Sequence, residues 1–176
     1  MAHAGSAEEQ LAGFLARFTD EVAARAEAIL GEMRRLYPIA LELVYDNYNA
    51  LAIGFGPTER PSEAIFSIAV FPRWVSLFFL QAVGLPDPDR ILRGNGKVAR
   101  HVVLTSPAML HEPAVGELMR EAAERAKVPF DPKGVHRLII KSISPTQRPR
   151  RPAEKSTVQA GTESKGKKTR ASAHPR

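Results

Sequence analysis

Residues 64–80 read AIFSIAVFPRWVSLFFL, and this stretch decides the fold that the sequence predicts. Two apolar runs, 64–71 and 75–80, are rich in aromatic and β-branched residues and flank the short turn Pro72-Arg73-Trp74. This arrangement is typical of a β-hairpin. The turn interrupts the stretch, which is also shorter than the roughly 20 apolar residues that a transmembrane helix needs. The stretch therefore predicts two paired strands and not a membrane span.

Further strand signals lie on both sides of this hairpin. Residues 41–45 and 50–55 are short apolar runs that precede it, and residues 98–104 and 135–143 follow it. The glycines, prolines and polar residues between these runs favour turns and loops. We therefore expect the strands to join into one antiparallel sheet.

Helical patterns open and close the strand region. Apolar residues recur at helical spacing from Leu11 to Leu36, Ser6 and Glu9 fit a capping box, and Pro38 ends the pattern. One long amphipathic helix is therefore predicted over residues 6–37.

A second helix is predicted over residues 107–127, either continuous or split near Pro113. Strands that are grouped between an opening and a closing helix indicate an α+β fold. The expected architecture is an antiparallel β-sheet packed against a long N-terminal helix and a C-terminal helix.

Basic residues are concentrated at the C-terminus. The whole chain has a formal net charge of +6. Nine basic and two acidic residues follow residue 144, so this tail carries +7 and residues 1–144 carry −1. Val158 is the only large aliphatic residue of the tail, so burial cannot offset the entropy lost on ordering it. The sequence therefore predicts an α+β domain over residues 1–144 and a disordered basic tail over residues 145–176.

Composition also limits the chemistry and the compartment. The chain contains no cysteine, which excludes disulfides, thiolate metal sites and a cysteine nucleophile. The first residues show no basic stretch followed by an apolar run, so no signal peptide is predicted. We therefore expect a cytoplasmic protein without a membrane partner.

The densest polar signal is RILRGNGKVARH at residues 90–101. A glycine-containing loop can present backbone N–H groups, and Lys97 and Arg100 add positive charge, so together with Asn95 they could hold a phosphate or a carboxylate. The spacing is not that of a Walker loop. The alternative interpretation is a glycine turn that leads into a strand with solvated basic side chains.

Two further turns carry candidate ligand-binding residues. Tyr48 lies in the polar segment Asp46-Asn47-Tyr48-Asn49, which is either the wall of a pocket or an ordinary β-turn. Arg73 and Trp74 lie at the hairpin turn. Trp74 could form an exposed platform or cap the edge of the core, and the core is favoured because tryptophan is usually largely buried. The complete set of predicted ligand-binding residues is Tyr48, Arg73, Trp74, Asn95, Lys97 and Arg100.

No catalytic or metal-binding arrangement is evident. The five histidines are scattered, and neither an HExxH pattern nor a Ser-His-Asp order is present. His101 and His136 lie in predicted strands that could face each other. We predict no catalytic residue, no metal ligand and no cofactor, and the balance favours a protein that is not an enzyme.

The basic tail is a candidate nucleic-acid contact. Its lysines and arginines could bind phosphates with an affinity that falls steeply in salt. The tail has no aromatic residue to stack on bases, so sequence specificity is not expected. The alternative is a solubilising extension. The residues proposed for these contacts are Arg148, Arg150, Arg151, Lys165, Lys167 and Lys168.

Several stretches together resemble the YdhG-like family, a bacterial family of unknown function. They are WVSLFF at 74–79, LPDP at 85–88, Leu92, GNGK at 94–97, the strand over 98–104, IKSIS at 140–144 and QRPRRP at 147–152. The resemblance covers roughly residues 37–152 and implies a compact α+β domain. One branch of the family is described as a frataxin-like iron chaperone, and frataxin-type iron binding uses an acidic helix ridge. The first helix here mixes its acids with Arg17, Arg25, Arg34 and Arg35, so iron binding is not carried over.

The leading functional hypothesis is a non-enzymatic binding module for a small anionic ligand or a protein partner, near Tyr48, Trp74, Lys97 and Arg100. A nucleic-acid-associated protein that acts through its basic tail is the alternative. An intracellular iron carrier is the third hypothesis and rests on the resemblance alone.

Overall fold

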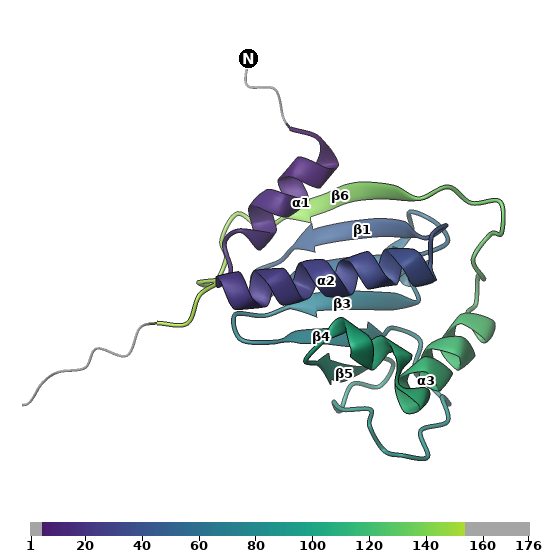
Figure 1. Ribbon diagram of the computed structural model, residues 1–176. Coiled ribbons are helices and arrows are strands. Elements are labelled where there is room, and N and C mark those ends of the chain that lie inside the picture. The colour runs from purple at the N-terminus through teal and green to yellow at the C-terminus, as the bar shows by residue number, and fades with distance from the viewer. Residues whose placement is uncertain (1–4, 154–176) are drawn as a thin grey trace, which may run out of the picture.

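The computed structural model describes residues 5–153, and within them six strands form one mixed sheet (Figure 1). The strand order is β5-β4-β3-β2-β1-β6. The α+β fold predicted from the sequence is confirmed, and so is the hairpin over residues 64–80. The strands are β1 Leu41–Asp46, β2 Leu51–Gly56, β3 Phe66–Val70, β4 Val75–Phe79, β5 Arg100–Leu104 and β6 Arg137–Ile143.

In the described part of the chain, three α-helices lie on the same face of the sheet (Figure 1). They are α1 Ala7–Leu15, α2 Asp20–Leu36 and α3 Pro113–Glu124, with short 3-10 helices η1 at Pro61–Glu63 and η2 at Pro107–His111. The capping box at the start of α1 is present as predicted, because Ser6 accepts from the Glu9 amide and Glu9 accepts from the Ser6 amide. The helix predicted near the C-terminus is split before Pro113, which was one of its two expected forms.

The core lies between α2 and the sheet because side chains of each strand alternate in direction. Ile53 of β2, Ile68 of β3 and Leu77 of β4 are fully buried against Ile29 and Met33 of α2. Each such side chain contributes about 1.5–3 kcal/mol by its removal from water. This packing fixes the sheet and thereby the turns at its ends. No helix in the described part of the chain is long and apolar enough to cross a membrane.

The long N-terminal helix predicted over residues 6–37 is wrong in one respect, because the structure has two helices. The chain turns between α1 and α2, and Phe18 is buried in this turn at 1% exposure. Thr19 begins α2 as its N-cap, accepting from the Val22 amide at 3.4 Å. Phe18 packs into the same core as the apolar residues of α1 and α2, so the apolar spacing continues across the turn. The spacing therefore does not reveal that the helix is broken.

The expectation of a fully antiparallel sheet is also corrected. Strands β1 to β5 pair antiparallel with their neighbours, but β6 pairs parallel to β1, with Leu41 opposite Arg137. The segment after α3 returns the chain to the end of the sheet where β1 starts, so both strands run in one direction (Figure 1). Hydrophobic alternation gives the face of a residue and carries no information on strand direction.

The boundary predicted at residue 144 lies too early. Residues 144–153, which we call the C-terminal strap, pack against the turns at the end of the sheet, and Arg150 is buried at 4% exposure. The segment 145–153 therefore does not behave as the disordered tail that was expected. The remainder of that tail, including Lys165, Lys167 and Lys168, lies outside the described residues.

Candidate functional site

A groove of about 870 Å³ opens where three segments meet at one end of the sheet. The β1–β2 turn, the β3–β4 turn and the C-terminal strap form its walls. The β1–β2 turn and the strap are about 100 residues apart in sequence, and the strand pairing of β1 with β6 brings them together. The lining of the groove includes Asn49, Phe71, Arg73, Trp74, Arg148 and Arg151.

An aromatic pair forms one wall of the groove. Phe71 and Trp74 stack with their ring centroids 4.9 Å apart and an interplanar angle of 22°. The Phe71 amide donates to the Trp74 carbonyl at 2.9 Å, which closes the turn and holds both rings in place. Trp74 is 42% exposed although tryptophan is usually largely buried. The preferred core interpretation of Trp74 is therefore wrong, and the ring presents a free surface to the groove.

Three arginines bring positive charge to the same groove. Arg73, Arg148 and Arg151 are all exposed, and no described residue that lines the groove is acidic. Arg73 and Arg148 make no ion pair with any described residue, and Arg151 lies 3.8 Å from the fully exposed Asp20. An ion pair at such an exposed site contributes little. The groove therefore carries nearly uncompensated positive charge.

Arg148 is held at the groove by Tyr48. Its amide donates to the Tyr48 carbonyl at 2.9 Å, and its guanidinium lies 5.9 Å from the centroid of the Tyr48 ring. A cation above an aromatic face is attracted by the ring quadrupole. Tyr48 is itself 51% exposed at the tip of the β1–β2 turn. The contact with Tyr48 restricts the positions of the Arg148 side chain but leaves its positive charge unneutralised.

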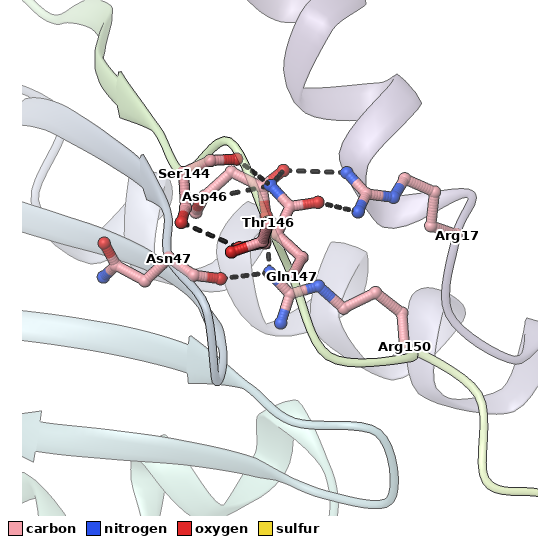
Figure 2. Close-up of polar contacts among 7 residues, drawn as sticks. All are labelled: Arg17, Asp46, Asn47, Ser144, Thr146, Gln147 and Arg150. Atoms are coloured by element: carbon pink, nitrogen blue, oxygen red, sulfur yellow. Dashed lines mark hydrogen bonds and ion pairs between the residues drawn. The ribbon is translucent and has the colours of Figure 1, made fainter.

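A buried polar cluster fastens the strap that carries Arg148 and Arg151 (Figure 2). Asp46, at the end of β1, is 1% exposed and accepts from three side chains. Arg17 donates to its Oδ2 at 2.8 Å, Gln147 donates to the same oxygen at 2.6 Å, and Arg150 donates to its Oδ1 at 2.7 Å. Arg17 also donates to Gln147, and Arg150 to the Asn47 carbonyl. We call Asp46, Arg17, Gln147 and Arg150 the Asp46 cluster.

The Asp46 cluster explains why part of a basic, apolar-poor tail is ordered. A buried carboxylate needs hydrogen-bonded cations, and removal of one member of such a pair destabilises a protein by about 3–5 kcal/mol. Arg150 additionally lies 5.6 Å from the ring centroid of Phe18, the residue that fills the α1–α2 turn. Docking of the strap therefore satisfies the charge at Asp46, and one wall of the groove forms as a consequence.

The predicted ligand-binding residues do not form one site. Arg73 and Trp74 line the groove, and Tyr48 contacts the lining residue Arg148. Lys97 and Arg100 line a separate pocket of about 390 Å³. In the β4–β5 pairing Phe79 lies opposite Arg100, so Arg100 is at the far end of β4 from Trp74. Asn95 is exposed and lines neither pocket.

The loop that carries Lys97 has the features of a structural turn. Gly94 has a φ of +97°, and a Cβ at this position would lie 3.3 Å from the His101 ring. Asp87 also faces this pocket, and its carboxylate accepts from the Ile91 and Leu92 amides at 3.0 and 2.9 Å. A carboxylate in the same pocket as Lys97 opposes anion binding there, so the geometry favours the glycine-turn interpretation of this loop.

The tail residues proposed for nucleic-acid contacts have separate places. Arg148 and Arg151 line the groove, Arg150 is buried in the Asp46 cluster, and Lys165, Lys167 and Lys168 lie outside the described residues. Two sets of residues that the sequence assigned to different functions thus share one groove. They are the aromatic residues of the β-turns and the arginines of the tail.

The histidines and acids make other contacts. His101 belongs to β5 and His136 adjoins β6, and these are the opposite edges of the sheet, so the two do not face each other. His136 contacts the buried Glu42 at 2.7 Å, and the helix acids Glu21 and Glu32 pair with Arg25 and Arg35. Among residues 5–153 no three histidines or acids gather in a way that could hold a metal ion.

From the sequence, no buried role was assigned to Asp46, which was placed with Asn49 in a polar turn that could line a pocket, and no role in a site was assigned to Arg17, Gln147 or Phe71. One signal could have found the first of these. In β1 the residues Glu42, Val44 and Asp46 share one face. When this face packs against an apolar core, both acids become buried and need cationic partners. The sequence gives no means of choosing those partners among 25 lysines and arginines.

No family model, curated protein or solved structure matches the chain. The resemblance to the YdhG-like family therefore stays a prediction. Functional inference rests on the groove itself.

Proposed function

We propose that the chain is a non-enzymatic binding module that holds a phosphate-bearing ligand in the groove between Trp74 and the strap. The observation that carries this proposal is the gathering of Arg73, Arg148 and Arg151 beside the exposed face of Trp74, with no acid among the described residues of the lining. The leading hypothesis of an anionic ligand is thus kept, and its location moves away from Lys97 and Arg100.

The side chains define the ligand chemistry. A guanidinium group can donate two parallel hydrogen bonds to one phosphate, and it remains charged at all relevant pH values. The indole face of Trp74 favours an offset stack with a planar ring. A ligand that carries both a phosphate and a planar ring, such as a nucleotide, uses both features. The described residues of the groove include no nucleophile paired with a base, which supports binding without chemistry.

Calorimetric titration of the full chain with ATP, AMP and inorganic phosphate tests the proposal. We expect ATP to bind more tightly than phosphate, because the ring adds stacking to the ion contacts. Arg148→Ala and Arg73→Ala should each weaken ATP binding about tenfold, as loss of one charge-assisted contact predicts. A thermal shift offers a second readout, since a hundredfold excess of ligand over its Kd stabilises the fold by about 2.7 kcal/mol.

Matched variants identify the pocket. Arg60→Ala removes an equally exposed arginine on the β2–β3 loop, at the other end of the sheet, and should leave binding unchanged. Arg100→Ala should also have no effect. If no phosphorylated ligand binds, or if Arg100→Ala abolishes binding while Arg148→Ala does not, the groove is not the ligand site.

A further inference from the structure

We infer that the ligand of the groove is single-stranded nucleic acid, with an unpaired base stacked on Trp74 and its phosphates on Arg73, Arg148 and Arg151. This inference rests on the proposed function and names the ligand class of the same site. Its first support is the alternation of aromatic and basic side chains. Arg73 and its chain neighbour Trp74 both line the groove, and the guanidinium of Arg148 lies over the ring of Tyr48.

This combination is the one that single-strand binders use. A positively charged groove follows the backbone, and bases stack on aromatic side chains irrespective of sequence. Tyr48 and Trp74 lie on neighbouring turns at the same end of the sheet, with exposures of 51% and 42%. A duplex cannot use them, because its bases are already stacked and paired within the helix.

The second support is the charge of the sequence that follows the last lining residue of the groove. Ala153 is a lining residue of the groove and the last described residue. After it the sequence contains six basic and two acidic residues, among them Lys165, Lys167 and Lys168. A mononucleotide needs no positive charge beyond the groove, whereas a polyanion that extends out of it gains from each such residue. The basic residues that follow the lining segment in the sequence thus favour a polymeric ligand.

Fluorescence of the full-length chain provides a direct test, because Trp74 is its only tryptophan. An oligothymidylate of about 12 nucleotides should quench this fluorescence as it binds. A blunt duplex of the same length should bind more weakly and leave the fluorescence unchanged. Anisotropy of the labelled strand, measured over a series of salt concentrations, gives the affinity and its salt dependence.

Variants separate stacking from charge. Trp74→Ala should weaken single-strand binding about tenfold with the salt slope unchanged, since a stacked base carries no charge contact. Trp74→Phe should restore much of the affinity. Arg148→Ala should weaken binding and reduce the slope of log K against log salt by about 0.7, which is the value for one phosphate contact on a single strand. Arg60→Ala is the control for loss of an arginine outside the groove.

Each outcome has a defined meaning. ATP binding at the groove without preference for the oligonucleotide would retain the proposed function and overturn this inference. Equal affinity of the chain and Trp74→Ala for the single strand, or tighter binding of the duplex, would also overturn it. Replacement of Lys165, Lys167 and Lys168 by glutamine should weaken binding only in part. If that replacement abolishes binding while the groove variants do not, the tail alone binds and the inference is wrong.

Discussion

Arg150 and Asp46 are 104 residues apart in the chain, yet the Arg150 Nη2 lies 2.7 Å from the Asp46 Oδ1 and both side chains are almost fully buried. The pair joins the end of β1 to the strap (Figure 2). Because the strap supplies Arg148 and Arg151 to the groove, the stability of this buried pair and the presence of the groove are linked.

The two partners of this pair should not be equally important for stability. Asp46→Ala leaves Arg17 and Arg150 without their anion, and Arg150 is buried, so we expect a loss of about 3–5 kcal/mol in the free energy of unfolding. Arg150→Met leaves Asp46 bound to Arg17 and Gln147, so its loss should be smaller. Urea unfolding at neutral pH measures both. A larger loss for Arg150→Met would show that Arg17 and Gln147 do not satisfy Asp46.

The turn between α1 and α2 should depend on Phe18. Phe18→Ala removes a ring that is 1% exposed, and a substitution of this kind at a buried site destabilises by about 3–5 kcal/mol. Phe14→Ala is the matched control, since Phe14 is only partly buried against the same core. Chemical denaturation should therefore rank Phe18→Ala well below Phe14→Ala in stability. Equal losses would mean that the break between the helices is held by other contacts.

The parts of the fold that follow from local pattern could be predicted from the sequence. The β3–β4 hairpin, the capping box at Ser6 and the split at Pro113 depend on residues that are close in the chain. The direction of β6 and the break at Phe18 could not be predicted in this way. Both depend on where tertiary packing places a segment, and the apolar spacing is the same for either arrangement.

The gathering of Trp74 with Arg148 and Arg151 at one groove could not be predicted, for a related physical reason. Composition identified Arg148 and Arg151 as basic tail residues and Trp74 as a turn residue, but their proximity depends on a charge pair between distant segments. The buried position of Asp46 makes the strap pack, and burial of one acid cannot be seen from the composition of a tail 100 residues later. A polar segment with few apolar side chains can thus become ordered through a small number of specific ion pairs.

Stability should fall on mild acidification because of His101. Burial of its ring, together with the nearby Arg93, lowers the pKa of His101 below its ordinary value of 6.5. The unfolded chain therefore binds a proton at higher pH than the folded chain, and stability decreases as pH falls below about 6.5 until the folded pKa is reached. Well above pH 6.5 the His101 ring is neutral in both the folded and the unfolded chain, so it contributes no pH dependence to stability there.

His101→Gln isolates this contribution, because glutamine does not titrate. Urea unfolding at pH 7.5 and 5.5 should show a smaller difference in stability for the variant than for the unaltered chain. The comparison cancels other groups that titrate in both proteins. Identical pH dependence in the two proteins would show that burial of the ring and the charge of Arg93 do not disfavour protonated His101.

Truncation at two positions tests whether the strap belongs to the domain. A chain that ends at Ala153 keeps the whole Asp46 cluster and should unfold at the same urea concentration as the full chain. A chain that ends at Ser144 lacks Gln147 and Arg150, so Asp46 retains Arg17 as its only partner in the cluster. We expect this shorter chain to lose several kcal/mol of stability, in the range given by removal of a buried ionic partner.

The same pair of truncations separates the groove from the tail in binding. The chain that ends at Ala153 keeps Arg148 and Arg151 and should still bind ATP, whereas the chain that ends at Ser144 should not. The comparison is meaningful only for folded protein, so circular dichroism at low temperature must first show native helix in both. If the shorter chain is as stable as the longer one and binds equally well, the strap contributes neither to the fold nor to the site. If the shorter chain is equally stable but no longer binds, the strap contributes to the groove and not to stability. The charge of Asp46 would then be tolerated without Gln147 and Arg150.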